Sequence, residues 1–187
     1  MNPTFLKGKK VVGTEGYMLG EVDSLDIDLT TWQANAFFVS LSDEAIVDLG
    51  FKKTFQHKVI VCLPTQLIKS VGDIVILKES IKNAEDVAEK GVVTNSTKLE
   101  GKKVVGSNGY LVGDFGGFDI DVDSWQVTGL QVSLADGVAT ELGFKRPFLS
   151  KVVVIIPSRI VRLIGNFITL DKDIKNLESL VECIRNC

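Results

Sequence analysis

The densest group of side chains with metal-binding chemistry is the run of alternating aspartates Asp119, Asp121 and Asp123. Alternate carboxylates can converge on one hard cation such as Ca²⁺. A calcium loop also needs a glycine at its sixth position and a bidentate acid at its twelfth, where this chain has Ser124 and Leu130. Because side chains alternate along a strand, we expect the acids on a solvated face, and the sequence predicts no metal site.

The other groups able to support catalysis or metal binding are few and scattered. His57 is the single histidine and no nucleophile motif accompanies it, so we expect a turn or surface residue. Cys183 and Cys187 lie four residues apart, but zinc normally takes four ligands and none stands nearby. Cys62 lies in an aliphatic run and is interpreted as a small buried hydrophobe, and three irregularly spaced cysteines argue against a disulfide scaffold. The sequence therefore predicts neither an enzyme nor a bound cofactor.

Paired basic side chains and two tryptophans are the candidate interaction residues. Clustered basic residues can bind nucleic-acid phosphates, and four pairs recur at symmetric positions: Lys9 with Lys10, Lys102 with Lys103, Lys52 with Lys53, and Lys145 with Arg146. The net charge of −3 and the isoelectric point near 5.3 favour solvated loop charges over an RNA surface. Trp32 and Trp125 at strand turns are expected to cap the core or, if exposed, to form binding hot spots. Capping is favoured because aromatic residues usually bury most of their area.

A long segment of the chain is written twice. Leu6–Gly13 recurs as Leu99–Gly106, an offset of 93 residues (99 − 6) that then holds without a gap. About 35 of roughly 85 aligned positions are identical, too many for chance at one fixed register. The two halves are therefore expected to share one fold, and Trp32 falls on Trp125.

Composition allows each copy its own core. The chain has 187 residues, of which 45% are hydrophobic. The longest aliphatic runs, 59–63 and 152–156, are too short to span a bilayer, and the first residues lack the apolar stretch of a signal peptide. We therefore expect a cytoplasmic protein without a transmembrane segment.

The hydrophobic period within each copy is that of β-strands. In the first copy apolar residues alternate along 19–28, with a slip between Val22 and Leu25 that indicates a bulge. Further strands are expected at 36–41, 59–63 and 73–77, and Ser42 predicts a short helix that ends at Gly50. About five or six such strands predict a small barrel that closes on itself.

After each predicted barrel the period becomes helical. Five apolar side chains three or four residues apart would share one helix face near the C-terminus: Ile174, Leu177, Leu180, Val181 and Ile184. A weaker pattern at 81–88 predicts a first helix that also connects the copies. The expected domains are a barrel at 1–78, a helix and linker at 79–97, a second barrel at 98–171 and an amphipathic helix at 172–187.

The motifs of each copy resemble those of the PRC-barrel family. They are Gly-Lys-Lys-Val-Val-Gly at 8–13, Gly-Tyr at 16–17, Leu-Gly-Glu-Val at 19–22, Asp-Ile-Asp at 26–28 and Val-Gly-Asp-Ile-Val-Ile-Leu at 71–77. The resemblance covers nearly the whole chain. It implies an all-β fold of two tandem PRC-type small β-barrels, each followed by a short α-helix.

The family also suggests a class of function. It includes the cytoplasmic domain of the photosynthetic reaction-centre H subunit, a ribosome maturation factor that binds a ribosomal protein, and stand-alone archaeal proteins. Some of the archaeal members resemble cell-division adaptors bound to the membrane-anchoring protein SepF. The resemblance therefore implies a non-catalytic protein-binding adaptor or scaffold with a SepF-like protein as a candidate partner.

Two further expectations concern the alternative function, which the paired basic residues suggest, and the arrangement of the two copies. An RNA-binding or ribosome-assembly factor is the alternative function. Many relatives have one barrel that dimerises, so the two copies of this chain are expected to form an internal pseudo-dimer. The residues proposed for interaction are Trp32, Trp125, Lys52, Lys53, Lys145 and Arg146.

Overall fold

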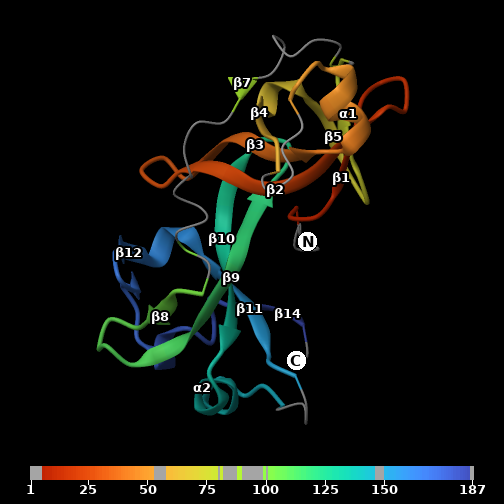
Figure 1. The fold of residues 1–187 in the computed structure, drawn as a ribbon. Helices are drawn as coiled ribbons and strands as arrows, with labels where there is room; N and C mark the ends of the chain where they lie inside the picture. The colour runs from red at the N-terminus through yellow and green to blue at the C-terminus, as the bar shows by residue number, and fades with distance from the viewer. Residues whose placement is uncertain are drawn as a thin grey trace. The chain divides into compact units, whose positions relative to one another are not determined.

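The computed structural model describes residues 6–52, 58–79, 81, 88–89, 99, 101–145 and 150–185. Two compact units are present, and β-strands dominate both of them (Figure 1). The first unit contains the first repeat together with the turn Val122–Trp125, and the second unit contains the rest of the second repeat. An all-β fold is thereby confirmed.

Seven strands form a mixed sheet in the first unit. Their order across the sheet is β5-β6-β1-β2-β3-β4-β7, with β1 and β6 parallel and the other neighbours antiparallel. The strands are β1 (Lys10–Val12), β2 (Met18–Asp28), β3 (Gln33–Leu41), β4 (Ile60–Pro64), β5 (Ile68–Val71), β6 (Val75–Leu77) and β7 (Ala88–Glu89), and the 3₁₀ turn η1 (Thr65–Leu67) joins β4 to β5.

The second unit repeats this order with its own strands. The sequence across the sheet is β12-β13-β8-β9-β10-β11-β14, and here β8 and β13 are the parallel pair. The strands are β8 (Lys103–Val105), β9 (Leu111–Asp121), β10 (Gln126–Leu134), β11 (Val153–Pro157), β12 (Val161–Ile164), β13 (Ile168–Leu170) and β14 (Glu182–Arg185), with η3 (Ser158–Ile160) before β12. In the described parts of both units the outermost strands stay unjoined, so closure into full barrels stays a prediction.

Local sequence signals account for several elements. The register of β2 against β3 shifts between Val22 and Ser24, which confirms the predicted bulge. Helix α1 (Asp43–Asp48) begins where the Ser42 hydroxyl accepts the amide of Ala45 at 3.1 Å, and Gly50 follows it with φ 76°. Its counterpart α2 (Asp136–Glu141) begins after Ala135, which offers no side-chain cap.

Two glycines set the spacing between the long strands. A Cβ on Gly20 would lie 2.0 Å from the backbone oxygen of Ser40, and one on Gly113 would lie 2.1 Å from that of Ser133. No side chain fits at such distances, so β2 meets β3, and β9 meets β10, only through glycine. Behind these contacts each unit has its own core, which includes the fully buried Phe37 and Leu63 in the first unit and Leu130 and Ile156 in the second.

The predicted C-terminal helix is wrong. Residues Ile174–Asn176 form a single 3₁₀ turn (η4) capped by Asp173, and the chain then becomes the strand β14. Strand β14 pairs with β11, so the β11 edge gains hydrogen bonds that a helix would have left unmade. Apolar residues with a helical spacing therefore form a strand where a free edge is available.

The first predicted helix, at 81–88, is also replaced by a strand at its C-terminal end, which the structure describes. Ala88 and Glu89 form β7, which pairs with Val61 and Cys62 of β4, so the predicted helix is wrong at its last position. Residues 82–87 lie outside the described residues. Each repeat thus adds a short strand to the edge beyond its β4 or β11.

Candidate interaction surface

The two predicted tryptophans occupy equivalent strained turns. Trp32 has φ 55° and Trp125 has φ 59°, in the left-handed region that side chains rarely enter. The amides of Thr30 and Thr31 donate to Asp28 Oδ1 at 2.7 and 3.3 Å, which tightens the first turn. These hydrogen bonds, that from the Thr30 amide above all, hold the pKa of Asp28 below its usual value.

Trp125 packs against the core of the first unit. Its ring meets Phe37 edge to face, with centroids 5.3 Å apart, and Phe37 is fully buried. The Ala34 amide donates to the Trp125 carbonyl at 2.9 Å, and Gln33 Nε2 donates to the Ser124 carbonyl at 2.8 Å. Trp125 is half-buried, and so is Trp32. The contact with Phe37 supports the packing interpretation of Trp125, and a binding role for either ring stays a prediction.

The basic pairs divide between structural contacts and open positions. Lys9 Nζ donates to the Gly72 carbonyl at 2.6 Å, and Lys102 Nζ makes the same bond to Gly165 at 2.5 Å. Lys52 and Lys145 are exposed. Lys53, Arg146 and His57 lie outside the described residues, so their predicted roles stay predictions.

The acidic run does not form one solvated face. Asp119 is only 8% exposed, and Thr128 Oγ1 donates to its Oδ2 at 2.6 Å, whereas Asp123 is exposed. Burial with an internal donor corrects the expectation that all three acids face solvent. In the described part of the chain there is no group of three or more metal-ligating side chains.

The cysteines also differ from expectation. Cys62 is half-buried in β4 and not fully buried. Cys183 lies in β14 and is disulfide-bonded, so its sulfur is not a thiol available to a metal. Cys187 lies outside the described residues.

The outer row of the second unit is a set of side chains that pair across four adjacent strands. Leu163 lies opposite Thr169, Thr169 opposite Val105, and Val105 opposite Leu111. Their sequence neighbours Val104, Val112 and Ile168 have no exposed surface, so strand alternation turns the outer row toward solvent.

Large apolar side chains on this face are solvent-exposed. Leu163 is 64% and Leu111 is 42% exposed, and Phe167 and Tyr110, which directly precede β13 and β9 in the sequence, are 54% and 68% exposed. Among the described residues, six large hydrophobic side chains are exposed, and these are four of the six. Four exposed large apolar side chains in these neighbouring segments make this face a candidate binding surface, in contrast to the scattered apolar residues that every protein surface carries.

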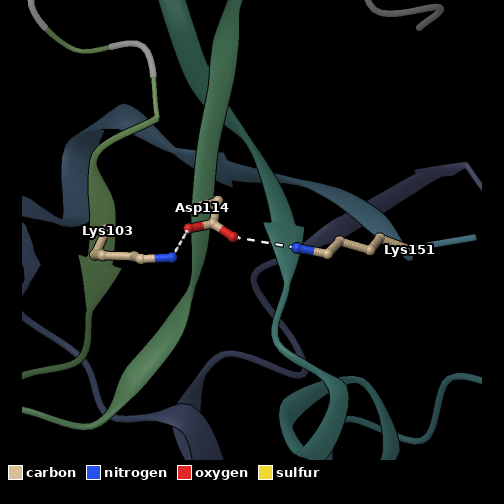
Figure 2. Close-up of polar contacts among 3 residues, drawn as sticks. All are labelled: Lys103, Asp114 and Lys151. Carbon is tan, nitrogen blue, oxygen red and sulfur yellow. Dashed lines mark hydrogen bonds and ion pairs between the residues drawn. The ribbon is translucent and has the colours of Figure 1, made fainter.

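A charged cluster borders the outer row. Figure 2 shows the Asp114 carboxylate between two ammonium groups, with Lys103 Nζ hydrogen-bonded to Oδ1 and Lys151 Nζ 3.2 Å from Oδ2. The hydrogen bond from Lys103 does most to hold the pKa of Asp114 below its ordinary value. Both lysines are more than half exposed, so the cluster stays open to solvent.

The first unit has the same row with other residues. Its paired side chains are Ser70, Ile76, Val12 and Met18. Only Ser70 among them is exposed, and the nearby Ile74 is 37% exposed. Tyr17 is tied to α1 through a hydrogen bond from its hydroxyl to Asp48 Oδ2 at 3.0 Å. Compared with the second unit, this face of the first unit therefore has a polar residue at the β5 edge and less exposed apolar surface.

Sequence reasoning missed the outer row altogether. Its members are ordinary strand residues, and only the pairing of β12, β13, β8 and β9 brings them together. A signal was available in the repeat, because the fixed offset places Leu163 on Ser70 and Phe167 on Ile74. At the first of these positions the second copy has a large apolar side chain in place of a polar one, and at the second an aromatic ring in place of an aliphatic side chain.

Neither a protein-family model nor a curated protein matches the chain. Among the described helices, none has the length and apolar character needed to traverse a lipid bilayer.

Proposed function

We propose that this chain is a non-catalytic protein-binding adaptor built from two copies of one β-sheet unit. The observation that carries the proposal is the exposed outer row of the second unit, with Leu163, Leu111 and Phe167 on one face. Keeping such side chains in water costs free energy that a partner would recover by covering them. The PRC-barrel resemblance supports the same class of function.

Finer features of the proposal derive from the sequence and from the resemblance. A cytoplasmic location, a role in archaeal cell division with a SepF-like partner, and an internal pseudo-dimer of the two repeats all stay predictions. The alternative RNA-binding function relies on the paired basic residues. Lys9 and Lys102 donate hydrogen bonds to backbone carbonyls, and Lys103 donates one to Asp114. Each of the two basic pairs that the structure describes in full therefore has at least one lysine hydrogen-bonded within the protein.

Affinity purification from the native host tests the proposal. A tagged chain should recover a protein partner in near-stoichiometric amount, and nuclease treatment should leave the recovery unchanged. Ultraviolet crosslinking of the same cells separates the alternative, because an RNA-binding protein would carry crosslinked RNA. Recovery of RNA without a stable protein partner would contradict the adaptor function.

A further inference from the structure

The outer row has a definite length and direction. It runs at right angles to the strands, from Leu163 at the β12 edge to Leu111 on β9. Neighbouring strands are about 4.8 Å apart, so four strands extend the row over roughly 14 Å. A helix rises 1.5 Å per residue, so about three turns cover the same length. An extended peptide added to β12 would contact one end of the row only.

A second line of side chains lies parallel to the outer row on the same face. Lys103 lies two residues before Val105 in β8, on the same face by strand alternation, and pairs with Asp114. Phe167 directly precedes β13 and lies two residues before Thr169, so continued alternation puts it on this face too. Lys151 completes this line at Asp114. The line therefore has an exposed aromatic ring at one end and two ammonium groups around one carboxylate at the other.

We propose that this face of the second unit binds an amphipathic helix of a partner protein. Its apolar stripe would pack on Leu163, Val105 and Leu111, and carboxylates on one flank would meet Lys103 and Lys151. The outer row and the line beside it together form the docking face. The proposal rests on the adaptor function and adds the surface and the chemistry of the partner.

The charge and shape of the face favour a protein helix over a lipid surface. An anionic membrane attracts clusters of several basic residues, whereas this line has two lysines with an acid between them, on a chain of net charge −3. A row that is one side chain wide suits the stripe of a helix, in which apolar residues recur every three or four positions.

A displayed peptide library tests the docking face directly. The full chain is immobilised and offered helices of about 14 residues with leucine fixed at positions i, i+4, i+7 and i+11, the remaining positions being randomised. Selected peptides should be enriched in Asp and Glu along one flank of the stripe. Their affinities for the full chain are then measured by fluorescence anisotropy.

Two substitutions separate the docking face from the rest of the surface. Leu163→Ser installs the residue that the first unit has at this position, and Phe167→Ser removes the exposed ring. Each should weaken binding of the selected peptides about tenfold or more, since one large apolar side chain would leave the interface. Val47→Ser is the matched control, because Val47 is 68% exposed on α1 and should leave affinity unchanged.

Lys103→Gln tests the acidic flank. This substitution should weaken the binding of peptides with acidic flanks. It should not change the affinity of peptide variants that have Gln at the acidic positions. Selection of no peptide, selection of basic flanks, or equal affinity for Leu163→Ser would overturn the docking face.

Two other occupants give distinct results. If wild-type chain but not Phe167→Ser co-sediments with phosphatidylserine-containing vesicles, the face binds membrane and the proposal fails. If wild-type chain but not Leu163→Ser dimerises in sedimentation equilibrium, the face binds a second copy and the proposal also fails. A native partner that still binds both variants would leave the adaptor function intact while overturning the docking face.

Discussion

The outward row of the sheet is built in the same register in both units but has different side chains. In strand order the first unit has Ser70, Ile76, Val12 and Met18, and the second has Leu163, Thr169, Val105 and Leu111. The inward neighbours are apolar and buried in both units, as Val11 and Val104 illustrate. The two copies thus share their framework and differ where the framework meets solvent.

The tyrosines beside the rows show the same contrast. Tyr17 donates a hydrogen bond to Asp48 at the end of α1, whereas the equivalent Tyr110 is 68% exposed. In the first unit the aromatic ring is held by the protein itself. In the second unit the ring of the same type is exposed to solvent. A duplicated fold can therefore keep one copy as structure and let the other change its surface.

The largest expected effect concerns the shared framework. Gly20→Ala and Gly113→Ala should each destabilise the chain by roughly 3 kcal/mol or more, because the new Cβ would lie within about 2 Å of a backbone oxygen. Urea denaturation followed by circular dichroism measures this loss. Gly72→Ala and Gly165→Ala are matched controls, since an added Cβ there meets nothing within 4 Å. A tolerated alanine at only one of the two sites would show that the frameworks differ.

The tryptophan turns test whether the copies share their backbone strain. Trp125→Ala should cost about 2–3 kcal/mol through the lost contact with Phe37, and Trp125→Gly about 1 kcal/mol less than that, because glycine adopts φ 59° without a Cβ penalty. The difference in stability between the alanine and the glycine variant should be the same at Trp32, where φ is 55°. Thermal unfolding of the four variants provides the comparison, and unequal differences would contradict it.

The acid between the lysines gives a smaller, pH-dependent effect. Asp114→Asn should cost about 0.5–1 kcal/mol at neutral pH through the lost ion pairs. Because the folded state lowers the pKa of Asp114 from 3.8, its contribution is present above 3.8 and is lost as the pH falls through the folded value. Denaturation between neutral and acidic pH should therefore show the variant and wild type converging. Glu21→Gln, at the equivalent exposed position in the first unit, is the control.

The smallest effect should come from Tyr17, whose hydroxyl is hydrogen-bonded to Asp48. Tyr17→Phe should cost about 0.5 kcal/mol, whereas Tyr110→Phe should be neutral. Burial, together with the hydrogen bond to Asp48, raises the pKa of Tyr17 above 10.0, so its contribution is complete below 10.0 and is lost as the pH rises through the folded value. Ultraviolet titration of the Tyr110→Phe protein follows Tyr17 alone, and Asp48→Asn should shift its ionisation to lower pH.

Sequence signals predicted elements whose causes are local. The Ser42 cap, the Gly50 terminus and the bulge after Val22 each depend on residues within a few positions, and all three are present. The repeat predicted that the two halves share one fold, and the sheets of the two units have the same strand order. Local chemistry and internal symmetry together were enough for most of each sheet.

Features decided by distant contacts escaped prediction. The apolar spacing around Leu177 and Ile184 fits a helix, but the open edge of β11, about thirty residues earlier, recruits part of this segment as a strand. Asp119 became buried because Thr128 on the next strand supplies a donor. The outer row exists only once Leu163 and Leu111 are brought to one face, so no short window of sequence contains it.

The parallel pairing of the first and sixth strands of each unit also affects how the protein is made. In each copy the partners are 64 residues apart, as in Val11 with Val75 (75 − 11) and Val104 with Ile168 (168 − 104). During synthesis β1 and β8 must wait for these 64 residues to leave the ribosome before this pair can form. Until then the strand edge is unprotected, and the pace of translation, together with any chaperone that binds the nascent chain, decides how long the edge stays open to wrong partners.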